Sequence, residues 1–528
     1  MPTTDLAWHW AVGANGCNCT RAGIVAAARG PNIVTVHGVL ATRHLRLLEC
    51  SFDGGATWAA ARDPTAIPES NHDKFSFSDR YKHKWPMAHG DIEPDTGLIG
   101  ARFSCAIGMA AVPRLLSVRV SSDEWRIDGV AIHQPGYPIV SGDDEAGSSS
   151  AGSSSSADVT VCVQYVYGTG YTSRTLQEFA AWYLLLGAKR IVVFDSMEPS
   201  LEPTAEQPTA MERKEALHSL SVALGRRFVV VRGLAVWDMM RRTRSHMSGQ
   251  SLAGNLCKSA AGALAHGSRP TFALMPDIDE YLTPPTSDAD QPHRLATRLA
   301  GSLKRLAAHV HGGLSATSLY LNDPNAVASR VHHGGGTTRC LSFASIYYVL
   351  PACKDIEEDP ARLGLSRPAI LRRLWRGQPD NFEAGPSYNW TSFVHWNFFV
   401  RSKFLVDATD DNVLTANHEC CCKPESRGKA QCSTRAGLTV NHTCATLEFM
   451  PLEHWHVRHF KGGGLGKDPM LCRHSVTMNA IQSIDGTRKH VTLQPTEVGF
   501  PLAWANEYLS SLRNLTRRLG GANDSWHL

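Results

Sequence analysis

The residues best suited to chemistry lie where an apolar segment ends in a short acidic motif. Residues 272–282 read FALMPDIDEYL, so Asp277 and Asp279 stand two positions apart. On a β-strand both carboxylates would share one face, and Ile278 between them would turn into the core. Carboxylate oxygens suit a hard divalent cation, and such a cation suits a diphosphate. The motif therefore predicts a metal-assisted diphosphate site, although an acidic strand end without a ligand is the alternative for an isolated Asp-x-Asp.

The segments around this motif alternate between strand and helix patterns. Strands are predicted at 158–168, 190–196, 227–233 and from Phe272, with helices near 175–186, 211–224 and 252–265. Successive βαβ units predict a largely parallel sheet, whose ligands bind at the carboxyl ends of the strands. Asp195 and the Asp277/Asp279 pair both follow predicted strands. We therefore expect them at one edge of the sheet.

The chain of 528 residues is too long for one core. Short β-rich pieces within residues 1–140, with turns such as Asp53-Gly54-Gly55, predict a β-sandwich and a possible carbohydrate-binding module. Residues 141–157 are rich in Ser and Gly and predict a linker. We assign residues 158–475 to the α/β domain and residues 476–528 to a C-terminal extension.

Composition narrows the classes of partner and the compartment. A net charge of +4 gives no indication of nucleic-acid binding, and no segment is long and apolar enough for a membrane anchor or signal. Fourteen cysteines and the Asn-x-Ser/Thr sites at Asn18, Asn389, Asn441, Asn514 and Asn523 favour a secretory lumen with disulfides. The cluster of Cys and His within residues 418–444 favours a disulfide-stapled loop over a zinc site, because its spacing is not that of paired Cys-x2-Cys.

Several of these motifs occur in an order that resembles a known family. They are the segment 162–200, then Gly249, Gln250, Asn255 and Cys257, then 277–282, 395–406, His418 and 452–460. In order and spacing they resemble glycosyltransferase family 92, over about residues 159–470. The resemblance implies a GT-A fold, a Rossmann-like and mostly parallel sheet. It also implies inverting transfer of a sugar, usually galactose from UDP-galactose, to a glycan acceptor in the Golgi with Mn²⁺ or Mg²⁺. Plant members that build β-1,4-galactan also carry an N-terminal carbohydrate-binding β-module.

The resemblance also suggests roles for individual residues. Asp195, Gln250, Asn255 and Asp277 would bind the nucleotide sugar, although Asp195 could be a helix N-cap or a turn residue and Gln250 and Asn255 could cap backbone groups. Asp277 and Asp279 would hold the metal, with His454 or His456 as a late ligand. Inversion requires a general base, for which the candidates are Asp355 and Glu357, with Glu358 beside them. The competing hypothesis is a non-catalytic carbohydrate-binding protein with a degenerate transferase domain.

Overall fold

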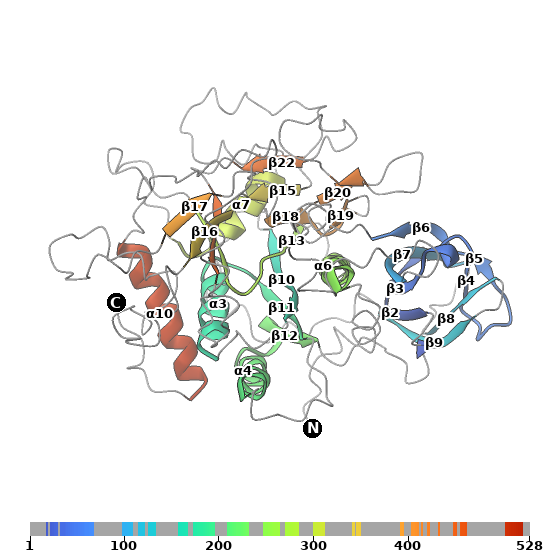
Figure 1. Ribbon diagram of the computed structural model, residues 1–528, viewed down its shortest axis with the longest axis horizontal. Helices are drawn as coiled ribbons and strands as arrows, with labels where there is room; N and C mark the ends of the chain where they lie inside the picture. Colours follow the sequence, from blue (N-terminus) through green and yellow to red (C-terminus); the bar gives the residue numbers. More distant parts are fainter. Residues whose placement is uncertain are drawn as a thin grey trace, which may run out of the picture.

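The structure of the chain is a computed structural model. It describes residues 17–18, 22–29, 32–67, 98–108, 115–121, 125–133, 157–166, 173–195, 208–231, 246–263, 270–284, 299–311, 340–343, 345–349, 391–394, 403–410, 413–415, 420–422, 431–432, 447–450, 455–461 and 502–520. A β-rich part and an α/β part lie side by side, coloured blue and green to red in Figure 1. The predicted linker 141–157 lies outside the described residues, apart from Ala157.

The N-terminal part is a single path of antiparallel and parallel pairings that folds over on itself. Its strands are β1 (Cys17–Asn18), β2 (Ala22–Arg29), β3 (Ile33–Ala41), β4 (Leu48–Ser51), β5 (Ala59–Ala60), β6 (Arg62–Ala66), β7 (Leu98–Ala106), β8 (Leu115–Val120) and β9 (Arg126–His133). The order is β5-β4-β8-β9-β2-β3-β7-β6, with β1 beside β2. Apolar residues of β3 and β7 and of β4 and β8 share one core, and a disulfide joins Cys50 of β4 to Cys105 of β7. The two portions of the sheet therefore face each other.

The turn between β4 and β5 is organised by one aspartate. Asp53 accepts hydrogen bonds at its carboxylate from the hydroxyl of Ser51 at 2.6 Å, from the amide of Thr57 at 3.0 Å and from the hydroxyl of Thr57 at 2.5 Å. These hydrogen bonds, of which the one from Ser51 has the largest effect, hold the pKa of Asp53 well below its usual value. Gly54 and Gly55 inside the turn both have positive φ, which glycine adopts without steric cost.

The α/β part is built on a mixed sheet. Its strands are β10 (Asp158–Val166), β11 (Arg190–Asp195), β12 (Phe228–Val231), β13 (Thr271–Leu274), β15 (Cys340–Phe343), β18 (Lys403–Asp407) and β22 (Leu447–Met450). The order is β12-β11-β10-β13-β18-β15-β22. Within this described sheet every strand except β18 runs in the same direction. The chain steps outward from β10 to β12 and then returns to place β13 on the other side of β10. The strand order thus reverses between β10 and β13.

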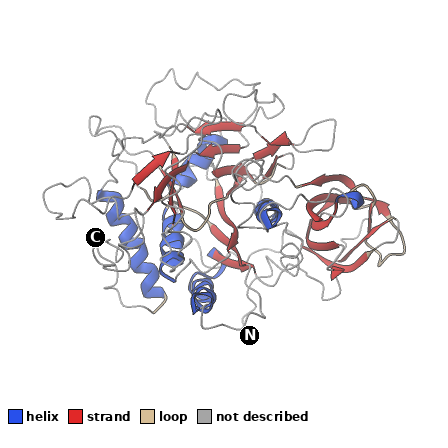
Figure 2. Cartoon of the chain, viewed as in Figure 1, coloured by secondary structure: helices blue, strands red, loops and turns tan. Residues whose placement is uncertain are grey.

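Helices cover both faces of this sheet (Figure 2). On one face lie α3 (Ser173–Leu185), α4 (Pro208–Leu224), α7 (Ser302–His311) and α10 (Leu502–Arg518), and on the other lies α6 (His246–Ala263). Alternate residues of β11 explain this: Ile191 and Val193 join the first core, whereas Val192 and Phe194 join the core under α6. A disulfide between Cys162 of β10 and Cys257 fastens α6 to the sheet.

Helix α10 belongs to the same core as α3, although residues 476–528 were assigned to an extension. The hydroxyl of Tyr508 donates to the carbonyl oxygen of Glu178 at 3.0 Å, and the Tyr508 ring meets Trp182 edge-on at 5.3 Å. Leu509, Leu512 and Leu515 are buried in that core. The helix therefore completes the α/β part.

Helix α6 also contacts the N-terminal part. Val39 and Ile67 of that part share a buried cluster with Leu252, Ala253 and Leu256 of α6. The hydroxyl of Ser259 lies 3.3 Å from Nε2 of His37. Figure 1 shows α6 between the main sheet and the N-terminal strands. One helix is thus shared by both parts.

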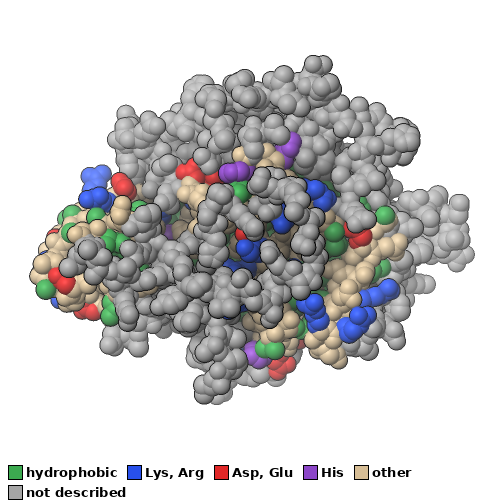
Figure 3. Space-filling view, turned by 180° about the vertical axis from the view of Figure 1, so that it is seen from behind, with side chains coloured by type: hydrophobic (Ala, Val, Ile, Leu, Met, Phe, Trp, Pro, Cys, Tyr) green, Lys and Arg blue, Asp and Glu red, His purple; other side chains and the backbone are tan. Residues whose placement is uncertain are grey.

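The described residues also form two smaller sheets. One has the order β14-β23-β16-β17, from β14 (Glu280–Thr283), β23 (His456–Lys461), β16 (Ser345–Val349) and β17 (Thr391–Val394). The other joins β19 (Val413–Thr415), β20 (Cys420–Cys422) and β21 (Gln431–Cys432). Among the described helices, none combines the length and apolarity needed to cross a membrane. The described basic and acidic side chains are scattered in small groups over the face seen in Figure 3.

Candidate functional site

The acidic motif lies in a turn at the point where the main sheet passes into the β14 sheet. Strand β13 ends at Leu274, and β14 begins at Glu280. The expectation that Asp277 and Asp279 share a strand face is therefore wrong. Pro276 explains the early end, because proline has no N–H to continue a ladder. Ile278 is buried as expected, at 1% exposure, while both aspartates are partly exposed.

The position of this turn follows from the strand order. In open α/β sheets, ligands bind beyond the carboxyl ends of the strands at the point where the order reverses. Here that point lies between β10 and β13, and the turn follows β13 directly. The Asp-x-Asp motif therefore occupies the edge at which such folds bind ligands.

The turn is closed by two hydrogen bonds between its first and last acidic residues. The amide of Asp277 donates to Oε2 of Glu280 at 2.7 Å, and the amide of Glu280 donates to the carbonyl oxygen of Asp277 at 3.1 Å. The Glu280 side chain is buried. Glu280 therefore fixes the backbone of the turn.

A buried lysine from a distant strand binds both ends of the turn. Nζ of Lys403 lies 2.8 Å from Oδ2 of Asp277 and 3.1 Å from Oε2 of Glu280. The lysine side chain has 0% exposure, against 28% for Asp277. Burial alone would lower the pKa of Lys403, but the carboxylates of Asp277 and Glu280 outweigh it and raise that pKa above its usual value. The ammonium is thus charged at neutral pH.

Two aromatic residues of α3 hold the start of β14. The hydroxyl of Tyr183 donates to the carbonyl oxygen of Glu280 at 2.9 Å and accepts from the amide of Leu282 at 3.1 Å. Nε1 of Trp182 donates to the carbonyl oxygen of Leu282 at 3.1 Å. Burial, with the nearby carboxylates of Glu280 and Asp277, raises the pKa of Tyr183 well above its usual value. The phenol therefore stays neutral and acts as donor and acceptor together.

Three carboxylates and a buried ammonium group belong to this turn. Asp277, Asp279 and Glu280 supply the carboxylates, and Lys403 bonds to those of Asp277 and Glu280. Among the described residues, no group of three or more His, Cys, Asp or Glu is arranged to hold a metal ion. Mg²⁺ and similar ions are often held by one or two carboxylates together with substrate phosphates. Asp279 and the second oxygen of Asp277 are suitable donors for that mode of binding.

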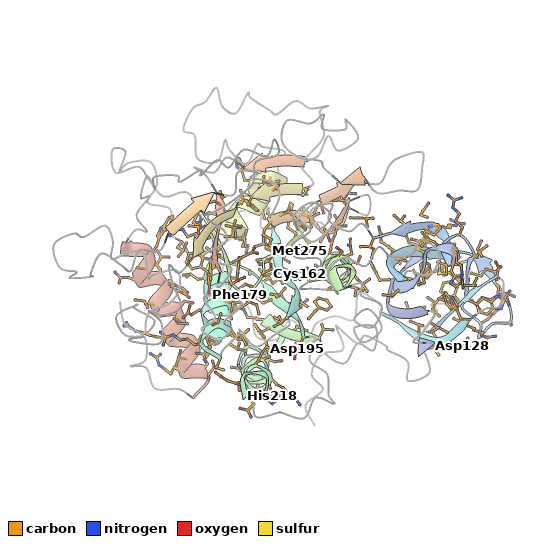
Figure 4. The ribbon with its side chains drawn as sticks, in the orientation of Figure 1. Asp128, Cys162, Phe179, Asp195, His218 and Met275 are labelled. Atoms are coloured by element: carbon orange, nitrogen blue, oxygen red, sulfur yellow. A yellow bond between two sulfur atoms is a disulfide. The ribbon has the colours of Figure 1, made fainter. Side chains whose placement is uncertain are left out.

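Asp195 ends β11 at the same edge but is paired within the protein. Its Oδ1 lies 3.5 Å from a guanidinium nitrogen of Arg213 on α4, and the side chains of Asp195 and Arg213 are 0% and 4% exposed. Figure 4 shows Asp195 on the side toward α4, away from Met275 and Cys162 beside α6. Asp195 therefore faces the helix layer that contains α4, whereas Met275 faces α6.

The two predicted nucleotide-binding residues of α6 differ in their surroundings. Nδ2 of Asn255 donates to the carbonyl oxygens of Ser251 and Thr415 at 2.8 and 2.7 Å, and Oδ1 accepts from the amide of Thr415 at 3.1 Å. Asn255 thus fastens β19 to α6. Oε1 of Gln250 is buried and has no hydrogen-bond partner among the described residues. Of the two, Gln250 has the capacity to accept from a ligand.

Gln250 stands at the height of the acidic turn. Near the other end of α6, Gly262 lies against the carbonyl oxygen of Ala408. The amide of Ala408 in turn donates to the carbonyl oxygen of Thr271, at the start of β13. From that level α6 rises by about 18 Å over the 12 residues back to Gln250. The chain from Thr271 rises by at most about 20 Å over the six residues to Asp277. The start of α6 and the turn therefore lie toward the same edge of the sheet.

Of the remaining predicted site residues, only His456 is among the residues that the structure describes. His456 lies on β23, is 6% exposed and pairs in register with Thr283. Glu280 is three register positions away, about 10 Å along the strand, so His456 does not adjoin the turn. The register partner of Glu280 is His459. His454, Asp355 and Glu357 lie outside the described residues.

Sequence reasoning missed Lys403 and Tyr183. Both contacts depend on long-range pairing: Lys403 reaches Asp277 across 126 residues, and Tyr183 reaches Glu280 across 97. A lysine at the start of the apolar run 404–406 was a weak signal, since a buried strand rarely carries an unpaired charge.

Comparison of the chain with protein-family models, with curated proteins and with solved structures found no match.

Proposed function

We propose that this protein is a glycosyltransferase that moves a sugar from a nucleotide diphosphate sugar to a glycan acceptor with the help of Mn²⁺ or Mg²⁺. The proposal rests mainly on the position of the Asp277/Asp279 turn, directly after β13 where the strand order reverses. Galactose as the sugar, UDP as the nucleotide and inversion at the anomeric carbon follow from the resemblance of the sequence to glycosyltransferase family 92. A GT-A fold is part of the same proposal.

The chemistry asked of the turn is electrostatic. As the glycosidic bond to the diphosphate breaks, negative charge grows on the leaving phosphate oxygens. A divalent ion held by Asp279 and the second oxygen of Asp277 would offset that charge. Glu280, Lys403 and Tyr183 keep the backbone and the Asp277 side chain fixed, so that the turn needs little rearrangement. Inversion also needs a base for the acceptor hydroxyl, for which we propose Asp355 or Glu357.

The edge offers further groups for the donor. The buried amide oxygen of Gln250 can accept from a ribose hydroxyl or a base N–H. The first turn of α6 has backbone N–H groups without partners inside the helix and carries the positive end of the helix dipole. The two disulfides between described residues are consistent with a secretory compartment such as the Golgi.

The decisive measurement is the release of nucleoside diphosphate from a panel of nucleotide sugars in the presence of Mn²⁺. We expect Asp279→Asn to lower turnover by about 100- to 1,000-fold, the size typical for removal of one electrostatic stabiliser. Asp158→Asn is the matched control, because Asp158 starts β10 at the opposite edge, where it pairs with Lys189. Wild-type turnover by the folded Asp279→Asn protein would refute the proposal.

One observation favours a second candidate, a carbohydrate-binding protein without catalysis. Lys403 already neutralises one carboxylate of the turn, as a protein without a metal would require. This candidate predicts glycan binding by the N-terminal part and no metal-dependent nucleotide binding. Calorimetry with Mn²⁺ and nucleoside diphosphates separates the two candidates.

A further inference from the structure

A buried lysine from another strand lies against the acidic turn. Lys403 is fully buried and bonded to Asp277 and Glu280, and it comes from β18, the only strand of the described main sheet that runs against the others. Because β18 is antiparallel to β13, its first residue lies at the carboxyl edge, where the amide of Met275 donates to the carbonyl oxygen of Phe404 at 3.2 Å. The reversed strand thus brings an ammonium group under the turn.

We propose that Lys403 is a positioning residue that sets both the charge of the turn and the oxygen of Asp277 that a metal can use. This inference rests on the proposed function. Lys403 holds Oδ2 of Asp277, which leaves Oδ1 of that partly exposed side chain for a ligand. It also offsets one of the negative charges of the turn. Free metal would then be held weakly, and the phosphate oxygens of the donor would complete its ligands.

The test is a charge series read by Mn²⁺ binding to the nucleotide-free protein, by calorimetry or by loss of the free Mn²⁺ resonance signal. Lys403→Gln removes one positive charge from the turn and should tighten Mn²⁺ binding by about tenfold or more. Glu280→Gln removes one negative charge and should weaken binding by a similar factor. The double variant keeps the charge sum of the wild type and should bind Mn²⁺ within a few fold of it.

A role in folding alone gives a different pattern. Loss of either partner would then weaken Mn²⁺ binding, and the double variant would not recover. Lys258→Gln is the matched control: Lys258 is also buried, but it bonds to the carbonyl oxygen of Asp410 far along α6 from the turn. It should leave Mn²⁺ affinity unchanged. Where Lys403→Gln alone does not fold, the addition of Lys403→Gln to Glu280→Gln must still raise Mn²⁺ affinity.

The two proposals fail in different ways. Wild-type protein that binds no Mn²⁺, with or without a nucleoside diphosphate, would overturn the proposed function and the role of Lys403 with it. Mn²⁺ binding that is lost in Asp279→Asn but shifts in the same direction in Lys403→Gln and Glu280→Gln would overturn the role of Lys403 alone. Equal effects of Lys258→Gln and Lys403→Gln would also overturn it.

Discussion

The hydroxyl of Tyr183 donates a hydrogen bond to the carbonyl oxygen of Glu280, 97 positions later in the chain, and so ties helix α3 to the acidic turn. The hydroxyl oxygen of Tyr183 also accepts a hydrogen bond from the amide of Leu282, so one phenol satisfies two buried backbone groups. Neither group has access to water as a substitute, because β14 is buried throughout. The geometry of the turn therefore depends on a side chain that does not belong to it.

Tyr183→Phe should destabilise the protein by about 2 kcal/mol, because it leaves a buried carbonyl and a buried amide without their partner. It should also weaken Mn²⁺ binding, since Glu280 loses its anchor. Denaturant unfolding and calorimetry measure the two effects. Tyr508→Phe is the control: it removes one hydrogen bond between α10 and α3 and should cost about 1 kcal/mol with no change in Mn²⁺ binding. Equal Mn²⁺ affinities in the two variants would show that Tyr183 does not support the turn.

Gln250 and Asn255 should respond in opposite ways to replacement by leucine. Gln250→Leu removes a buried oxygen that lacks a described partner, so stability should stay the same or rise by up to about 1 kcal/mol. Its affinity for nucleoside diphosphate should fall by about 3- to 10-fold, the value of one hydrogen bond. Unfolding curves and nucleotide titrations test both statements.

Asn255→Leu should instead destabilise the protein by about 3 kcal/mol, because the backbone of Thr415 loses two partners in a buried site. Nucleotide affinity of the folded protein should be unchanged. An Asn255→Leu protein of normal stability that no longer binds nucleotide would reverse the assignment of the two residues.

Asp53 should give the N-terminal part a stability that disappears in acid. Its pKa is lowered in the folded protein, so its contribution is complete above the unfolded value of about 4 and is lost as the pH falls toward the folded pKa. Thermal unfolding should therefore separate wild type from Asp53→Asn at neutral pH, and the difference should shrink below about pH 4. A difference that persists at the lowest pH would mean that the Asp53 carboxylate is not what holds the turn.

The local pattern of the sequence predicted the elements of the α/β part well. The predicted strands 158–168 and 190–196 and the helix between them match β10, β11 and α3 to within about two residues at each end. The end of α3 was readable because Gly187, with φ of 98°, follows it. Hydrophobic periodicity is a local signal, and these elements are long and strongly periodic.

Contacts between distant segments were not readable in the same way. The place of β18 beside β13, which delivers Lys403, and the packing of α10 on α3 leave no mark on the periodicity of either segment. The strand expected for Asp277 and Asp279 was wrong for a local reason, since Pro276 ends the ladder. Of the candidate site, the motif and the sheet edge were predicted from the sequence, but the internal cation and its supporting phenol required the fold.

The sharing of α6 bears on how the protein can be divided. Leu252, Ala253 and Leu256 pack against Val39 and Ile67. A shortened chain that begins at β10 would therefore expose a hydrophobic surface along α6. Such a fragment should aggregate during expression, and that failure would not test the proposed activity. Work on either half should therefore start from the undivided chain.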